Sequence, residues 1–273
     1  MQTKQFNYQG KKISYGTGGN GPLVILLHGF GEDGTIWQNQ FDAFPEHQLI
    51  VPDLPGSGES EGIDDMSMER LAEAMKALAE NEWNGKEEKR CILVGHSMGG
   101  YIALAFAEKY PEALHAFGFF HSTAYADGEE KKATRLKGIE FVERNGAFEF
   151  LKTITPNLYA PATKEKRPEL IEEHLTSTRN FSGESLVQYY KAMMQRPDRT
   201  NVLRNSQVPV LFVMGKYDNA VPLEDVLKQC HLPQLSYIHL LENSGHTGMK
   251  EEAETSNKIL SQFMSTVETI AYT

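Results

Sequence analysis

Short runs of consecutive apolar residues recur along the chain, as is typical of β-strands buried on both faces. The pattern predicts five such strands, at 23–27, 48–52, 116–120, 208–214 and 235–241. A smaller hairpin is expected over 5–15, turning near Gln9 and Gly10. The strands are therefore expected to form the interior of a sheet.

Helical periodicity fills the spaces between these strands. Met68, Leu71, Met75 and Leu78 fall on one face of a helix, and Ser67 precedes them as an N-cap. A closing helix is predicted over 251–267. Strands that alternate with helices predict an α/β fold, with a mostly parallel, doubly wound sheet covered on both faces.

The alternation breaks between 127 and 200. This stretch is helix-like and charged, has interleaved aromatic residues and shows no strand pattern. We therefore predict an α/β core formed by 1–126 and 201–273, interrupted by a helical cap inserted at 127–200.

Residues 91–94 predict a sixth buried strand, which runs into Gly95-His96-Ser97-Met98-Gly99 and then into an apolar, helix-like stretch. A G-x-S-x-G sequence between a strand and a helix is typical of a nucleophile elbow, where a sharp turn exposes the serine hydroxyl. Side chains at 95 and 99 would collide as the strand and helix approach each other. Although the pentapeptide also occurs by chance, its context favours Ser97 as a nucleophile.

Composition narrows the possible partners and cellular location. The 273 residues are 40% hydrophobic and 23% charged, with a formal net charge of −10, which argues against nucleic acid or an anionic membrane as the partner. The two cysteines do not suggest a disulfide framework. No secretory signal or apolar stretch of about 18 residues is evident, so a cytoplasmic location is expected. We expect a small-molecule partner, and a monomer or a homodimer.

A serine nucleophile needs a general base that a third group orients. In parallel sheets such groups gather at the carboxyl ends of the strands. Asp218 follows the 208–214 strand and His246 follows the 235–241 strand, so Ser97, Asp218 and His246 occur in the order this elbow architecture uses. Asp127 is a rival for the acid, and Glu242 is a weaker one.

The tetrahedral intermediate of acyl transfer also needs N–H donors for its oxyanion. The backbone N–H of Met98 heads the helix after the elbow and is the first expected donor. The second is expected from the loop His28-Gly29-Phe30-Gly31, and we assign it to Phe30.

Together these motifs make the chain resemble α/β-hydrolase-fold proteins of the capped, single-domain kind. The resemblance covers residues 22 to about 250 and rests on His28-Gly29, Asp53-Leu54-Pro55-Gly56-Ser57-Gly58, the elbow, Asp218 and Ser244-Gly245-His246. Its motifs are specific for the fold but not for the substrate. Similar proteins include carboxylesterases, lactonases, thioesterases, carbon–carbon bond hydrolases and cofactor-free haloperoxidases. Ser97 argues against dehalogenases and epoxide hydrolases of this fold, which use an aspartate nucleophile.

A second glycine pattern could be mistaken for a dinucleotide site. Residues 29–34 spell G-x-G-x-x-G after a strand, and Asp53 lies further on. Glu32 and Asp33, however, would bring negative charge to the place where a pyrophosphate must lie. No metal-binding or phosphate-loop motif is evident, so neither a cofactor nor a metal is expected.

The substrate pocket is the least defined part of the prediction. Aromatic and Met residues of the cap mostly pack its helices, and a minority are expected to cover Ser97. The residues expected to line a pocket are His28, Trp37, Tyr125, Tyr159 and Met194.

The sequence thus predicts a serine hydrolase that cleaves a small ester or a related acyl substrate through an acyl-enzyme. One alternative is a ligand-binding signalling protein, since hydrolase-fold receptors keep an intact triad. The other is a carbon–carbon bond hydrolase of a dienoic ketoacid. Natural substrate and chain-length preference remain open.

Overall fold

A single eight-stranded sheet forms the centre of the molecule in the computed structural model, which describes residues 1–83, 85 and 87–269. The strands are β1 (Gln2–Tyr8), β2 (Lys11–Gly18), β3 (Leu23–Leu27), β4 (Gln48–Pro52), β5 (Cys91–His96), β6 (Leu114–Phe120), β7 (Val210–Gly215) and β8 (Ser236–Leu241). Their order is β1-β2-β4-β3-β5-β6-β7-β8. β1 and β2 pair antiparallel, as do β2 and β4, and all pairs from β4 to β8 are parallel.

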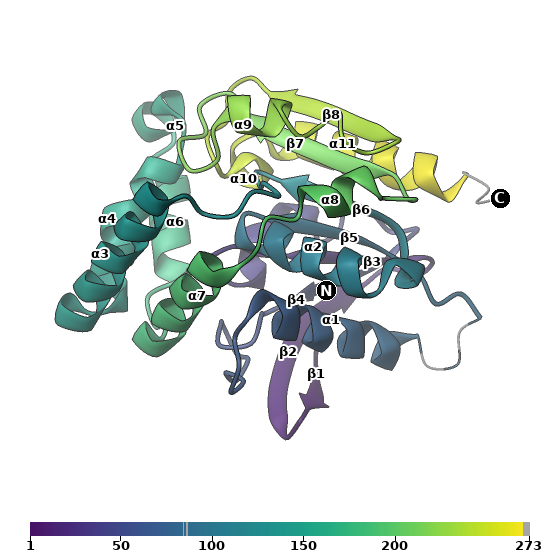
Figure 1. Cartoon of the computed structure of the whole chain (residues 1–273), viewed down its shortest axis with the longest axis horizontal. Helices are drawn as coiled ribbons and strands as arrows, with labels where there is room; N and C mark the ends of the chain where they lie inside the picture. The colour runs from purple at the N-terminus through teal and green to yellow at the C-terminus, as the bar shows by residue number, and fades with distance from the viewer. Residues whose placement is uncertain (84, 86, 270–273) are drawn as a thin grey trace.

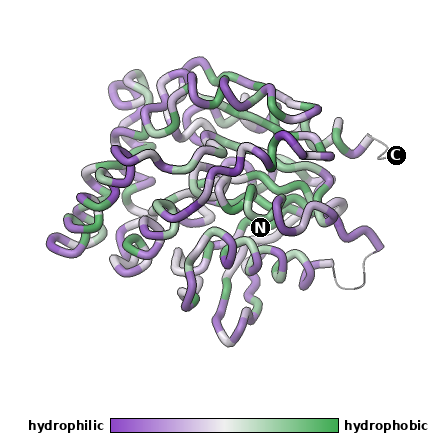
Figure 2. Tube along the Cα trace, in the orientation of Figure 1, coloured by the Kyte–Doolittle hydropathy of each residue, from purple (hydrophilic) through white to green (hydrophobic). Residues whose placement is uncertain are grey.

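The central strands are buried on both faces because an apolar cluster covers each side of the sheet, and successive side chains of a strand point to opposite sides. In β3, Ile25 and Leu27 join the apolar cluster that contains α1 (Met68–Glu82) and α2 (Met98–Lys109). Val24 and Leu26 join the opposite cluster, which contains η1 (Gly34–Gln40) and α11 (Ala253–Glu268). Figure 2 shows the resulting green centre, whereas the surrounding helices mix purple and green. The α/β fold class is confirmed.

Helices fill the chain between β6 and β7. They are α3 (Glu129–Asn145), α4 (Ala147–Ile154), η3 (Thr155–Leu158), α5 (Pro161–Lys166), α6 (Glu169–Ser177), α7 (Gly183–Gln195) and α8 (Thr200–Arg204). Figure 1 shows α3, α4, α6 and α7 together at one side of the sheet. The short elements η2 (Pro111–Ala113), α9 (Leu223–Leu227) and α10 (Gly248–Glu251) complete the fold. The division at 127 and 200 remains a prediction.

Because β5, β6, β7 and β8 are parallel neighbours, the residues that follow them reach the same edge of the sheet. Ser97 follows β5, His121 follows β6, Asp218 follows β7 after a short turn, and His246 follows β8. Backbone hydrogen bonds extend the sheet past the strand ends, from the Ser97 N–H to the Phe120 carbonyl (3.0 Å) and from the His121 N–H to the Val213 carbonyl (2.9 Å).

Candidate active site

Ser97 lies at a strained turn between β5 and α2. Its φ is 50° and its ψ is −115°, a backbone conformation that residues other than glycine rarely adopt. The turn is possible because residue 95 is a glycine. A Cβ at this position would lie 2.1 Å from the carbonyl carbon of Gly99. A side chain at 95 is therefore excluded by the close approach of strand and helix, as the elbow motif predicts.

His246 and Asp218 are hydrogen-bonded. Nδ1 of His246 lies 2.7 Å from Oδ2 of Asp218, and both side chains are almost fully buried. Oδ1 of Asp218 accepts the backbone N–H groups of Ala220 and Val221, at 2.9 Å each. Burial alone would raise the pKa of Asp218, but the charge of His246 and the contacts with His246 and His121 hold it far below its ordinary value. Asp218 is therefore an ionised partner for the imidazole.

His96 links the segment of Ser97 to that of His246. The two imidazole centroids are 4.9 Å apart, and Nε2 of His96 lies 2.8 Å from the backbone carbonyl oxygen of His246. Nδ1 of His96 lies 2.9 Å from Oε2 of Glu32. Since both partners are acceptors only, His96 donates from both nitrogens and carries a positive charge. Burial alone would lower the pKa of His96, but the Glu32 charge raises it overall.

Glu32 also holds the loop that carries the predicted oxyanion donor. Its Oε2 accepts the Gly29 N–H at 2.7 Å, and a Cβ on Gly29 would lie 3.0 Å from Cβ of Ser97. Burial would raise the pKa of Glu32, yet His96 and these hydrogen bonds hold it well below its ordinary value. The 28–32 loop, the elbow and the His246 loop thus converge on one buried ion pair.

The predicted oxyanion donors lie on two of these segments. Met98 is the first residue of α2, so its N–H has no acceptor within the helix. The Phe30 ring stacks on Tyr190 of α7 with centroids 4.1 Å apart, which anchors the loop to the helical insertion.

The insertion also contacts the His246 loop directly. The His246 N–H donates to the Leu158 carbonyl at 2.6 Å. Glu251 accepts from the Ala160 N–H (2.8 Å) and Thr163 hydroxyl (2.6 Å) on one side, and from the Gly245 N–H (2.8 Å) on the other. The loop geometry around His246 therefore depends on the insertion above it.

Three residues expected to line the pocket are buried and contact other parts of the protein. Trp37 is fully buried beneath the sheet, against Phe120 with ring centroids 5.3 Å apart. His28 is also fully buried, and its Nε2 accepts the Leu54 N–H at 2.9 Å. Tyr159 is buried inside the insertion, 3.0 Å from Nδ1 of His174. Core packing and loop hydrogen bonds account for the burial of these three side chains, and their place in a substrate pocket stays a prediction.

The other two pocket residues are partly accessible. Tyr125 lines a hollow of about 480 Å³ with Asp127, Lys131 and Arg196. Met194 is partly buried against the main apolar cluster.

Sequence reasoning missed His96, Glu32 and His121. His121 directly follows the apolar 116–120 strand, as Ser97 follows its own strand, and this shared position was an available signal. Asp127, the rival acid, is instead paired with Arg135 and Arg196, at 2.6 Å and 3.0 Å. Glu242 is exposed and pairs with Lys216.

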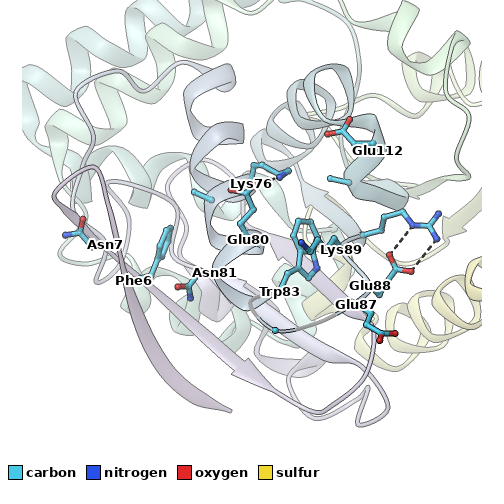
Figure 3. Close-up of a pocket in the computed structure, with 14 residues that line it drawn as sticks. Phe6, Asn7, Lys76, Glu80, Asn81, Trp83, Glu87, Glu88, Lys89 and Glu112 are labelled. Atoms are coloured by element: carbon cyan, nitrogen blue, oxygen red, sulfur yellow. Dashed lines mark hydrogen bonds and ion pairs between the residues drawn. The ribbon is translucent and has the colours of Figure 1, made fainter.

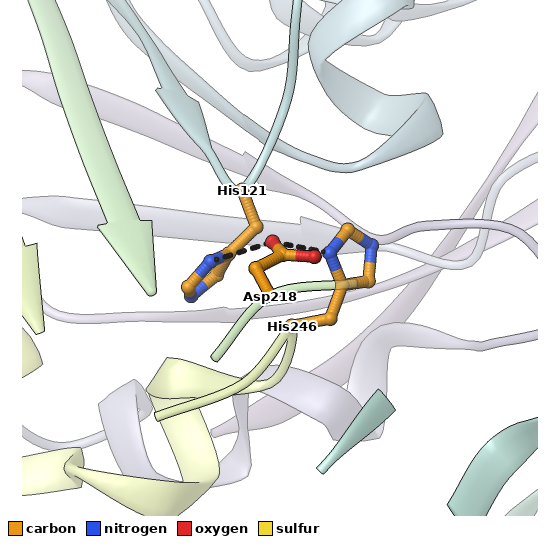
Figure 4. A group of neighbouring side chains, drawn as sticks. All are labelled: His121, Asp218 and His246. Atoms are coloured by element: carbon orange, nitrogen blue, oxygen red, sulfur yellow. Dashed lines mark hydrogen bonds and ion pairs between the residues drawn. The ribbon is translucent and has the colours of Figure 1, made fainter. Parts of the chain in front are cut away.

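Within the described residues, His121, Asp218 and His246 offer ligand atoms that lie within 4.8 Å of one another (Figure 4). The 2.7 Å separation between Nδ1 of His246 and Oδ2 of Asp218 fits a hydrogen bond. Two tetrahedral ligands of one zinc ion would lie roughly 3.3 Å apart, given bonds of about 2.0 Å. The cluster is therefore interpreted as a hydrogen-bonding group.

A separate surface hollow of about 1240 Å³ is lined by residues that include Lys76, Trp83 and Glu112 (Figure 3). Lys89 and Arg90 also line it and directly precede β5, so it lies toward the amino ends of the strands, away from Ser97. Ligands of open parallel sheets bind at the carboxyl ends. The hollow is therefore not assigned to the chemistry.

The fold, together with Ser97, Asp218 and His246 at the carboxyl ends of the strands, indicates the class of the protein. Residues 24–257 match the model of the alpha/beta hydrolase family, and the chain belongs to that family. It is a hydrolase. In the described residues, no helix is both long enough and apolar enough to cross a membrane.

Two relatives cover most of the chain. A 2-hydroxy-6-oxononadienedioate/2-hydroxy-6-oxononatrienedioate hydrolase of Burkholderia vietnamiensis is 27% identical, over 91% of this chain and 88% of that protein. A thermophilic esterase from Thermogutta terrifontis, solved with malate bound, is 28% identical with a TM-score of 0.91, covering 98% of this chain and all of the other.

An enol-lactonase from Burkholderia xenovorans LB400 has a TM-score of 0.86 at 19% identity, covering 96% of this chain and all of the other. At that identity the likeness shows the fold alone.

Proposed function

We propose that this hydrolase cleaves a small ester or related acyl substrate through an acyl-enzyme on Ser97. His246 removes the Ser97 proton as the hydroxyl attacks the carbonyl carbon, and returns it to the leaving group. Asp218 holds the imidazole tautomer and stabilises its charged form. Water, activated by His246, then releases the acid.

One observation carries the proposal: the 2.7 Å hydrogen bond between His246 and Asp218. It leaves Nε2 of His246 as the nitrogen that can act as base. Its loop is tied through His96 to the strained elbow that presents Ser97. The remaining rivals for the acid, Asp127 and Glu242, have cationic partners of their own.

The backbone N–H groups of Met98 and Phe30 are assigned as the hydrogen-bond donors that stabilise the oxyanion of the tetrahedral intermediate. Each preorganised donor of this kind contributes on the order of 3 kcal/mol to the transition state. Support comes from the position of Met98 at the first turn of α2 and from the anchoring of the 28–32 loop by Glu32.

The residues around the 28–32 loop fit a substrate whose acyl group is uncharged better than one whose acyl group carries a carboxylate. The aromatic rings of Phe150 and Tyr190 pack against each other and against Phe30 of the 28–32 loop. The nearby guanidinium groups of Arg135 and Arg196 already share Asp127. The esterase with a TM-score of 0.91 supports ester chemistry.

Labelling with a fluorophosphonate tests the nucleophile. We expect wild type and Ser177→Ala, which changes an exposed serine of α6, to be labelled equally, and Ser97→Ala to be unlabelled. Equal labelling of Ser97→Ala would refute the proposal. A panel of p-nitrophenyl esters from acetate to decanoate would then define the acyl preference.

Carbon–carbon bond hydrolysis is the second candidate, and it is favoured by the relative from Burkholderia vietnamiensis. The same three residues would serve it. Turnover of a dienoic ketoacid, followed by loss of its ultraviolet absorbance, with slower turnover of every ester in the panel, would favour this reaction.

A further inference from the structure

His121 is a buried histidine at the edge of the proposed site that the mechanism above does not use. It directly follows β6, and its φ of 54° is close to that of Ser97 on the neighbouring strand. Its side chain is fully buried. A histidine in this left-handed backbone region is uncommon and is maintained only when its surroundings fix it.

The structure around the ring provides that fixation. A Cβ on Gly248 would lie 2.6 Å from Nε2 of His121, and one on Gly215 would lie 2.9 Å from its Cε1. The Gly248 N–H donates to Nε2 at 3.1 Å. The two glycines therefore leave room for the imidazole, and the backbone of α10 fixes its orientation.

This hydrogen bond determines the tautomer. Because Nε2 accepts, a neutral His121 carries its proton on Nδ1. Burial lowers the pKa of His121 to about 4, although the charge of Asp218 opposes the effect, so the ring is neutral near pH 7. The titratable groups facing the ring are Asp218, His246 and His96, with imidazole centroids at 5.7 Å and 6.1 Å for the two histidines.

The protonated nitrogen faces the carboxylate. Nδ1 of His121 lies 3.2 Å from Oδ2 of Asp218, the same oxygen that His246 contacts at 2.7 Å, and Figure 4 shows the carboxylate between the two rings. The His121 contact is longer, and its N–H does not point squarely at the oxygen. Nδ1 of His121 therefore makes a close electrostatic contact with Oδ2 and no well-directed hydrogen bond.

We propose that His121 is a positioning residue, whose Nδ1–H dipole lies against Oδ2 of Asp218 beside the His246 hydrogen bond and so holds the carboxylate in place and partly offsets its charge. The inference rests on the proposed function, in which Asp218 orients His246. In a variant without this N–H, Oδ2 would carry its full negative charge toward the imidazole of His246.

The tautomer can be tested without any activity measurement. In ¹⁵N-histidine-labelled protein, we expect His121 to show a protonated Nδ1 and an unprotonated Nε2 from about pH 8 to about pH 5. The resonances are assigned by their loss in His121→Asn. A proton on Nε2, or protonation of both nitrogens within this range, would overturn the proposal.

Two variants test the effect on catalysis. His121→Asn keeps an N–H donor near the place of Nδ1 and tolerates the left-handed backbone, whereas His121→Ala removes the donor. We expect Asn to retain kcat within about threefold, and Ala to lose about tenfold in kcat with KM unchanged. In the His121→Ala variant, kcat/KM falls to half its maximum at one acidic pH and one alkaline pH, and we expect the acidic one to rise by about half a unit.

Equal losses in the two variants, with the pH profile unchanged, would overturn the inference. If Ala does not fold, His121→Asn and the ¹⁵N spectra still decide. Failure of the proposed function is separate, because it would appear as fluorophosphonate labelling of Ser97→Ala whatever the behaviour of His121.

Discussion

Nδ1 of His96 lies 2.9 Å from Oε2 of Glu32, and both side chains are sealed from solvent. The pair connects the loop after β3 to the residue before the proposed nucleophile. Because His96 also donates to the His246 carbonyl, the ion pair fixes three segments that are distant in the sequence. Removal of one partner of such a buried pair costs folding free energy, because the other partner is left as an unpaired buried charge.

We expect Glu32→Gln to lower the free energy of unfolding by about 3 kcal/mol, because His96 must then lose its proton or remain unpaired. Urea denaturation of the variant measures this loss. Glu143→Gln, on the exposed face of α3, is the matched control and should change stability by less than about 0.5 kcal/mol. Equal stability of the two variants would contradict the structural role of Glu32.

The same pair predicts a pH dependence of stability. The raised pKa of His96 gives stabilisation that is complete below its ordinary value of 6.5 and is lost as pH rises through the raised value. The lowered pKa of Glu32 gives stabilisation that is present above 4.5 and is lost as pH falls through the lowered value. The difference in unfolding free energy between wild type and His96→Gln should therefore narrow as pH rises above 6.5 through the raised pKa of His96. A difference that stays constant in denaturation curves over this range would be inconsistent with a charged His96.

Asp218→Asn should reduce kcat by about a thousandfold to ten-thousandfold, because the amide cannot stabilise the charged imidazole and favours the wrong tautomer. Steady-state kinetics on the best ester of the panel provide the measurement. Glu242→Gln changes the exposed rival, which pairs with Lys216, and should leave kcat within about twofold. A comparable loss in both variants would remove Asp218 from its proposed role.

Asp127→Asn should destabilise the protein by about 3 kcal/mol while leaving KM and kcat far less affected than Asp218→Asn. Asp127 precedes α3 and Arg196 follows α7, so their 3.0 Å ion pair joins the two segments that enter and leave the helical insertion. Thermal unfolding measures the effect, with Glu129→Gln on exposed α3 as control. A melting temperature equal to that of the control would exclude this role.

Gly95→Ala should prevent folding or lower the melting temperature by at least about 10 °C, because the new Cβ meets the backbone of Gly99 and cannot be relieved by a rotamer change. The soluble yield and thermal unfolding report the result. Gly128→Ala is the control, since its Cβ would meet nothing within 4 Å and its φ is −71°. Unfolding of Gly95→Ala at the same temperature as the control would contradict the close approach of β5 and α2 at the elbow.

The local patterns were sufficient for the elements and the class. Continuous apolar runs predicted the buried strands because a strand covered on both faces needs apolar residues at every position. The elbow was recognised because glycines at 95 and 99 leave the space that a sharp strand-to-helix turn requires. Those features depend on neighbouring residues, which a sequence displays directly.

Only the tertiary structure decided which charged and polar side chains, distant in the sequence, contact one another. Glu32 and His96 carry no local signature of their roles, and the place of His121 after a strand does not show what it contacts, because each role comes from a partner that the strand order brings near. The same reason explains the burial of Trp37, His28 and Tyr159, which depends on elements packed from elsewhere in the chain. Sequence determined which side chains could do chemistry, and the parallel order of β5 to β8 determined which of them meet.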